Sequence, residues 1–275
     1  MAAIKEGRAG RPRNERQKLM TQSFDLSGRV ALVTGASSGL GRRFSRILAA
    51  SGAKVALAAR RVDRLAALAD EIKAAGGEAA AVAMDVTDEA SVIAGFDAAQ
   101  EALGPVDTVI ANAGMNSRGL ATDIPIDEFD QVMAINVRGV FLTAREGARR
   151  MIAAGSRESG KGRVVLVASI GAVKVLPGLV PYCASKAAVA MMGKAMAREW
   201  ANRGININVI CPGYIETELN ADWFSEEGGK KQVAGFPRRR LMDEQDLDGM
   251  MLWLCADASR AVTGSTFVLD DGQTL

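Results

Sequence analysis

The chain has 275 residues, of which 48% are hydrophobic and 24% are charged; its formal net charge is +2, and it contains no histidine. The lack of histidine excludes serine-hydrolase triads and histidine-dependent dehydrogenase sites. Proton transfer must therefore use tyrosine, lysine, a carboxylate, cysteine or water. The three cysteines form no CxxC motif, so we expect neither a disulfide framework nor a bound metal.

The charge is unevenly distributed along the chain. Residues 1–20 carry six basic and two acidic side chains, a net of +4, so the other 255 residues sum to −2. Residues 1–23 show no apolar periodicity and are predicted to be a disordered tail. Its Gly10–Arg13 sequence, GRPR, resembles a minor-groove arm, and a nucleic-acid role stays open as a minor alternative. The body has no basic surplus, so nucleic acid is not the expected partner.

From residue 24 onward, short β-like runs alternate with helical stretches. Strands are predicted over Val30–Thr34, Lys54–Ala59, Ala79–Met84, Asp107–Ala111, Arg163–Ala168, Ile205–Ile210 and Ser265–Leu269. Helices are predicted over Gly39–Ser51, Val62–Ala75, Asp88–Leu103, Pro125–Ala154, Pro181–Arg203 and Asp243–Ala256. This alternation predicts one α/β domain over residues 24–275, a doubly wound Rossmann-type parallel sheet with helices on both faces.

The first predicted strand runs into a glycine-rich turn, Thr34–Gly41, with the sequence TGASSGLG. Glycines let the backbone approach a pyrophosphate closely, and the following helix offers amide donors at its N-terminus. The alternative is a purely structural turn. Because this turn follows the first strand of a βαβ series, we favour a dinucleotide phosphate site.

The end of the second strand bears on the choice of cofactor. An NAD site usually places an acidic residue there to bind the ribose 2′-hydroxyl. This chain has Ala59, Arg60 and Arg61 instead. Guanidinium groups match phosphate geometry, so we predict NADP, with Arg60 as the main ligand of the 2′-phosphate. A solvated basic loop, with NAD as cofactor, is the competing interpretation.

A tyrosine and a lysine four residues apart, Tyr182 and Lys186, follow Pro181, which is well placed in the first turn of a helix. This spacing puts both side chains on one helix face. An ammonium group nearby stabilises phenolate, so we expect it to lower the tyrosine pKa. The pair alone could be a coincidence, but together with the glycine turn it indicates an oxidoreductase.

These motifs, in this order, resemble the short-chain dehydrogenase/reductase family over nearly all of residues 24–275. The resemblance rests on TGASSGLG, Asn112-Ala113-Gly114, Asn136 inside a long helix, Ser169 after the fifth strand, the Tyr182–Lys186 pattern and Pro212-Gly213. It implies a seven-stranded parallel sheet and assembly into a homo-oligomer, a tetramer or a dimer.

The resemblance also implies roles for individual residues. Tyr182 would be the general acid in reduction, Ser169 would bind the substrate oxygen, and Lys186 would bind the nicotinamide ribose. Asn136 would hold a water that links Lys186 to solvent. The implied cofactor-binding residues are Gly35, Ser37, Ser38, Gly39, Leu40, Gly41, Arg60, Arg61, Asp85, Val86, Asn112, Ala113, Gly114, Tyr182, Lys186, Pro212, Gly213, Ile215 and Thr217.

Two departures from the family pattern stand out. Asp270-Asp271-Gly272 replaces one Asp and two glycines, and residues 155–162 form a slightly long loop. We expect neither to touch the site. Residues 214–240 lie where the family has its substrate lid, and their aromatic and basic side chains could contact substrate or simply pack and face solvent.

The sequence therefore predicts a cytoplasmic enzyme that transfers hydride between NADP(H) and a carbonyl or secondary alcohol. No apolar run is long enough to span a membrane, so no membrane association is expected. The alternatives are an NAD-dependent dehydrogenase of the same family and a non-catalytic nucleotide-sensing scaffold. The identity of the substrate is not legible in the sequence.

Overall fold

The computed structural model describes residues 24–216 and 221–275; the predicted tail, residues 1–23, and the predicted site residue Thr217 lie outside the described residues. Runs of small and β-branched residues form seven strands, most of them buried on both faces. The strands are β1 (Val30–Thr34), β2 (Lys54–Ala59), β3 (Glu78–Ala83), β4 (Thr108–Ala111), β5 (Gly162–Val167), β6 (Ile205–Pro212) and β7 (Thr266–Leu269).

The strands form one sheet in the order β3-β2-β1-β4-β5-β6-β7, and every neighbouring pair is parallel. The predicted doubly wound parallel sheet is thus confirmed. The chain runs from β1 outward to β3, then returns to place β4 on the other side of β1. Between β1 and β4 the winding direction changes, and the crevice outside the carboxyl ends of these strands is where such sheets bind ligands.

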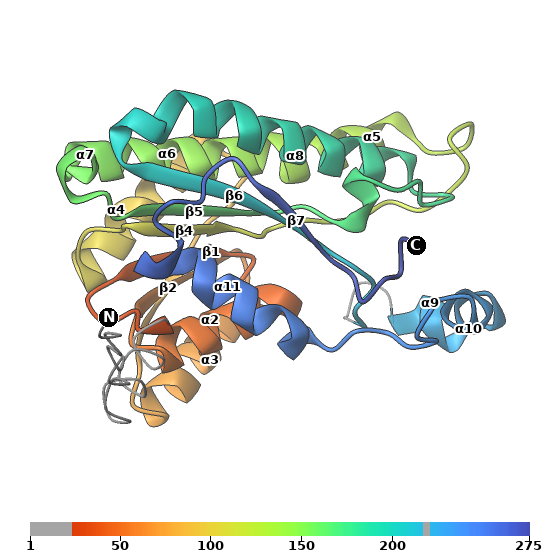
Figure 1. The fold of residues 1–275 in the computed structure, drawn as a ribbon, viewed down its shortest axis with the longest axis horizontal. Coiled ribbons are helices and arrows are strands. Elements are labelled where there is room, and N and C mark those ends of the chain that lie inside the picture. The colour runs from red at the N-terminus through yellow and green to blue at the C-terminus, as the bar shows by residue number, and fades with distance from the viewer. Residues whose placement is uncertain (1–23, 217–220) are drawn as a thin grey trace, which may run out of the picture.

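Two layers of helices cover the sheet (Figure 1). One hydrophobic core lies between the sheet and α4 (Glu89–Leu103), α6 (Val140–Ala153) and α8 (Val180–Trp200). A second core lies between the opposite face and α2 (Gly39–Ala50), α3 (Val62–Ala74) and α11 (Asp248–Cys255). None of the described helices is long and apolar enough to cross a membrane.

Shorter helical elements complete the fold. They are α5 (Ile126–Met133), η2 (Ala134–Gly139), α7 (Ser156–Ser159), η3 (Ile170–Ala172), η4 (Ala201–Arg203), α9 (Ala221–Ser225), α10 (Glu227–Ala234), η5 (Glu244–Leu247) and η6 (Asp257–Ser259). Most predicted boundaries agree with the structure to within a few residues. The exception is the single helix predicted over Pro125–Ala154, which is wrong in its middle because η2 is a π-helical segment between α5 and α6.

Two buried arginines lie at the amino-terminal end of the sheet, away from the crevice. Arg29 and Arg163 are 5% and 1% exposed, and Asp257 pairs with both. Removing Asp257 deprives the desolvated Arg163 guanidinium of this counter-charge, whereas Arg29 keeps its ion pair with Asp107 at 3.5 Å. Since the Asp257 side chain is itself 73% exposed, solvent replaces part of the lost interaction.

We therefore expect Asp257→Asn to lower the free energy of unfolding by about 1–2 kcal/mol in chemical denaturation. Glu78→Gln is the matched control, because Glu78 pairs with Lys54 where both side chains are about half exposed. The control should change stability by less than ~0.5 kcal/mol. Equal losses in the two variants would contradict this interpretation of the arginine cluster.

Candidate active site

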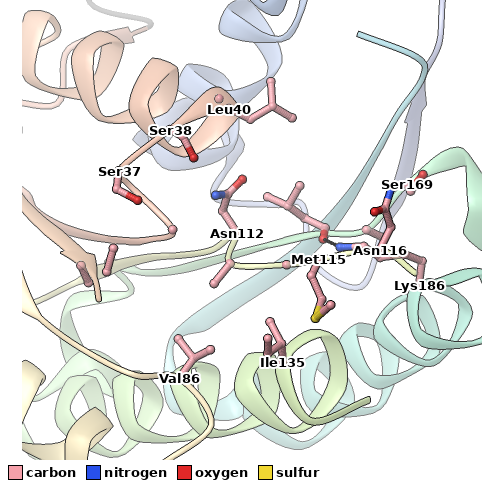
Figure 2. Close-up of a pocket in the computed structure, with 18 of the residues that line it drawn as sticks. Ser37, Ser38, Leu40, Val86, Asn112, Met115, Asn116, Ile135, Ser169 and Lys186 are labelled. Atoms are coloured by element: carbon pink, nitrogen blue, oxygen red, sulfur yellow. Dashed lines mark hydrogen bonds between the residues drawn. The ribbon is translucent and has the colours of Figure 1, made fainter. Parts of the chain in front are cut away.

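A cleft of about 490 Å³ opens at the carboxyl ends of the strands, across the β1–β4 switch point. All the predicted cofactor and catalytic residues line it except Gly41, Asn136 and the undescribed Thr217. Figure 2 shows the glycine turn with Ser37, Ser38 and Leu40 at one end of the cleft and Ser169 and Lys186 at the other. Gly41 and Asn136 lie behind the surface and support it.

The glycine turn packs so closely that two of its glycines have no room for a side chain. Gly35 has φ +69°, and a Cβ there would lie 3.0 Å from the Ala113 Cα. A Cβ on Gly41 would lie 2.3 Å from the Gly35 oxygen. The start of α2 is thereby held against the turn, and its first amides and positive dipole end suit a pyrophosphate.

The end of β2 places two arginines beside the glycine turn. Arg61 donates from Nη2 to the hydroxyls of Ser37 at 3.0 Å and Ser38 at 2.9 Å. Hydrogen bonds from Thr87 lower the pKa of the Asp85 carboxyl, and the nearby charge of Arg60 contributes a smaller lowering. The Arg60 side chain is exposed. Both Arg60 and Arg61 line the cleft at the end of β2, where their guanidinium groups could bind an anionic group.

The ends of β1 and β4 are joined by side chains. The Thr34 hydroxyl accepts hydrogen bonds from the amides of Asn112 and Ala113, each at 3.1 Å. Asn112 also donates from Nδ2 to the backbone oxygen of Thr34 at 3.0 Å. Asn112 lines the cleft as predicted, and its amide group also fixes the switch point at which the cleft opens.

Tyr182 lies in the first turn of α8 and faces Ser169, which follows β5. Burial raises the pKa of Tyr182, and a hydrogen bond with Ser169 opposes the shift. The expectation of a lowered Tyr182 pKa is wrong, because desolvation of the phenol outweighs the effects that would lower it. A raised pKa keeps Tyr182 protonated at neutral pH, which is the form that can donate a proton to a carbonyl oxygen.

Lys186 lies one turn after Tyr182 on α8 and is only 4% exposed. Its Nζ donates to the Val167 oxygen at 2.9 Å and lies 5.6 Å from the centre of the Tyr182 ring. Burial lowers the pKa of Lys186 to about 8. The predicted pairing of the two side chains on one helix face is present in the structure.

The buried lysine predicts a pH-dependent effect on stability. Because its folded-state pKa is below the unfolded value, the unfolded chain binds more protons between pH 8 and pH 10.5, and stability rises with pH there. We expect the unfolding free energy of wild type minus that of Lys186→Met to rise by about 2–3 kcal/mol between about pH 7 and about pH 10.

Denaturant titration at several pH values measures this difference. Lys194→Met is the control, since Lys194 is an exposed lysine of the same helix. A difference for Lys186→Met that is flat with pH, or no steeper than that of the control, would contradict the assignment of a desolvated ammonium.

Asn136 lies in the π-helical segment η2 and is fully buried. Its amide accepts from the Met115 amide at 2.8 Å and donates to the Met115 oxygen at 2.8 Å and to the Ser185 hydroxyl at 2.9 Å. A Cβ on Gly114 would lie 3.3 Å from Asn136 Oδ1 and 3.4 Å from Lys186 Nζ. Asn136 and Lys186 therefore approach each other across the space that Gly114 leaves, which suits a polar link between them.

Sequence reasoning missed several residues that line the cleft. Four follow from the ends of strands, so the parallel topology could have indicated them: Ala58, Met84, Val167 and Ala168. Met115 and Asn116 directly follow Asn112-Ala113-Gly114. Gln131 and Ile135 come from α5 and η2, and no local motif marks them.

As expected, Asp271 is not among the residues that line the cleft. It pairs with Arg238 and Arg240, which follow the α9–α10 segment. The family's glycine has no side chain for such a contact. The long loop at residues 155–162 contains α7 and leads into the start of β5, at the sheet end opposite the cleft.

The fold and this cleft define a Rossmann-type oxidoreductase, and comparison with known proteins agrees. The family model described as short chain dehydrogenase matches residues 29–228. A γ-butyrolactone 1′-reductase of the A-factor type from Streptomyces virginiae is 36% identical over 256 residues, covering 91% of this chain and 97% of the relative.

Solved structures are also similar. A short-chain type dehydrogenase/reductase from Mycobacterium marinum is 39% identical with a TM-score of 0.86, covering 92% of this chain and 98% of the other. A gluconate 5-dehydrogenase from Burkholderia cenocepacia, in complex with NADP and tartrate, is 33% identical with a TM-score of 0.87, covering 93% and 98%. The chain belongs to the short-chain dehydrogenase/reductase family and is an NAD(P)-dependent oxidoreductase of alcohol or carbonyl groups.

Proposed function

We propose that this enzyme transfers hydride between NADP(H) and a carbonyl or secondary alcohol, with Tyr182 as the proton donor and acceptor. The observation that carries the proposal is the juxtaposition of Tyr182, Ser169 and Lys186 at one end of a cleft whose other end presents Arg60 and Arg61. NADP(H), when bound, supplies or accepts the hydride. The protein has to position the substrate carbon and manage the proton.

The proton chemistry follows from the side chains. Reduction of a carbonyl develops negative charge on its oxygen, and hydroxyl donors fixed beside that oxygen stabilise the charge. Ser169 donates a hydrogen bond to it, and Tyr182 donates the proton. Lys186 donates to the Val167 oxygen, and its Nζ lies 5.6 Å from the centre of the Tyr182 ring, beside the group that donates the proton.

The preference for NADP rests on the end of β2. Ala59 stands where a carboxylate would bind a ribose 2′-hydroxyl and repel a phosphate, and Arg60 follows it. Arg61 is already bonded to Ser37 and Ser38, so we assign the 2′-phosphate mainly to Arg60. Bound NADP in the Burkholderia cenocepacia relative supports the same choice.

Turnover with a substrate panel tests this function. Ketones, 3-oxoacyl thioesters, sugars, gluconate and steroids are the classes tested, each as its carbonyl form with NADPH and as its alcohol form with NADP⁺. We expect at least one class to turn over and to do so faster with NADP(H) than with NAD(H). Tight binding of NADPH without turnover of any class would instead favour the non-catalytic nucleotide-sensing scaffold.

A further inference from the structure

Two turns of unusual backbone conformation face each other near the cleft. Among the residues that the structure describes, only Arg239 and Asp271 have a positive φ without being glycine, each at 52°. L-residues other than glycine rarely adopt this conformation. The two turns are joined by ion pairs, from Asp271 to Arg238 Nε at 3.1 Å and to Arg240 Nε at 2.9 Å.

The segment that contains Asp271 is also hydrogen-bonded to the backbone of Tyr214, the residue after Pro212-Gly213. Gln273 is 3% exposed; its Oε1 accepts from the Tyr214 amide at 2.6 Å, and its Nε2 donates to the Tyr214 oxygen at 3.2 Å. Both polar atoms of this buried side chain are thus used on one backbone unit. The backbone oxygen of Gln273 accepts a hydrogen bond at 2.9 Å from Nζ of Lys174, a residue of the loop that follows Ser169.

Tyr214 and Arg240 belong to the two ends of the α9–α10 segment, and these ends meet. The Met242 amide donates to the Tyr214 oxygen at 3.0 Å, and Ile215 and Met242 form a β-bridge. We call residues 213–215 and 238–242 the neck. In Figure 1 the C-terminus lies between β7 and the α9–α10 pair, next to this neck.

We propose that Asp271 and Gln273 are positioning residues, and that residues 270–274 form a C-terminal clasp that fixes both ends of the neck. Gly213 and Ile215 of the neck line the cleft, so the clasp sets the position of one wall of the site. The proposal rests on the proposed function only for its second measurement, which uses NADPH.

The internal structure of the clasp supports this role. Asp270 accepts hydrogen bonds from the Gly272 amide at 3.1 Å, the Thr274 amide at 2.8 Å and the Thr274 hydroxyl at 2.6 Å. This compact turn presents the Asp271 carboxylate, only 14% exposed, to Arg238 and Arg240, whose side chains are 68% and 53% exposed. The carboxylate is the more buried partner of both ion pairs, so its charge is the group to test.

Hydrogen exchange of the neck amides tests the clasp without any substrate. Asp271→Asn keeps the size of the side chain and tolerates a positive φ, but removes the charge. Gln273→Met removes the two hydrogen bonds to Tyr214 with little change in volume. We expect each variant to exchange the amides of Tyr214 and Met242 about three- to tenfold faster than wild type. Protection in β4 should not change.

The second measurement is the Kd for NADPH. We expect Asp271→Asn to raise it about threefold or more at low salt, with the ratio to wild type falling toward one in concentrated NaCl, since exposed ion pairs are screened. Glu71→Gln is the control, because Glu71 on α3 also binds two arginines, Arg42 and Arg46 of α2. It should leave the Kd at the wild-type value.

The outcomes separate the two proposals. Unchanged neck exchange in both variants would overturn the clasp, and so would faster exchange with an unchanged NADPH Kd. If wild type bound no NADPH at all, the proposed cofactor would be wrong. The exchange rates of the amides of Gly213 and Ile215 would then decide whether the clasp positions this wall.

Discussion

Tyr182→Phe should lower kcat by about 10²–10⁴-fold and leave the Kd for NADPH close to that of wild type. Phenylalanine keeps the ring that packs beside Ser169 and Lys186 but removes the proton that the substrate oxygen receives. No histidine exists in the chain to replace it. Steady-state kinetics with the best substrate of the panel, together with a fluorescence titration of NADPH, measures both quantities.

Tyr214→Phe is the matched control, because Tyr182 and Tyr214 are the two tyrosines of the chain. The Tyr214 ring stacks on Phe236, and its pKa is raised by burial, so it too is a desolvated phenol. Its replacement should cost much less activity, because its backbone rather than its hydroxyl is what the clasp holds. A Tyr182→Phe enzyme that kept roughly half of the wild-type rate would contradict the assignment.

The second large effect concerns the cofactor: Ala59→Asp with Arg60→Val should reverse a wild-type preference for NADPH into one for NADH. A charge-assisted contact of Arg60 with the 2′-phosphate contributes about 1.5–3 kcal/mol, and the new carboxylate repels phosphate while binding the bare ribose hydroxyl. This corresponds to roughly 10–100-fold in kcat/KM, toward the lower value because Arg60 is exposed.

The measurement is kcat/KM for both cofactors in both proteins with one substrate. Arg64→Val is the control for loss of an exposed arginine nearby, on the first turns of α3. It should leave the preference unchanged. If wild type used NADH as well as NADPH, or if the double variant kept the original preference, Arg60 would be a solvated surface charge.

Much of the sheet could be predicted because each strand is a short apolar run that ends at a turn signal. The predicted bounds of β1 and β2 agree with the structure residue for residue. The π-helical segment η2 could not be predicted, because residues 125–154 read as one continuous helix. Its departure from α-helical bonding accompanies a tertiary contact, the bonding of Asn136 to the backbone of Met115.

At the site, residue types and spacing predicted many of the side chains that line the cleft, but not how deeply those side chains are buried or what contacts them. The four-residue spacing of Tyr182 and Lys186 was sufficient to place both on one helix face. It could not show that burial raises the pKa of Tyr182, because desolvation depends on elements far away in the sequence. The contacts of Asp271 were missed for the same reason, since they join residues 238–240 to the C-terminal segment.

The most direct test of the central claim is isotope transfer from NADPH in which both hydrogens on the transferring carbon of its nicotinamide are replaced by deuterium. The wild-type enzyme is incubated with this cofactor and the carbonyl substrate found in the panel, and the alcohol product is analysed by mass spectrometry. The proposed function predicts deuterium at the former carbonyl carbon in wild type and almost no product with Tyr182→Phe. Reduced product without deuterium, or equal product from the variant, would contradict hydride transfer at this site.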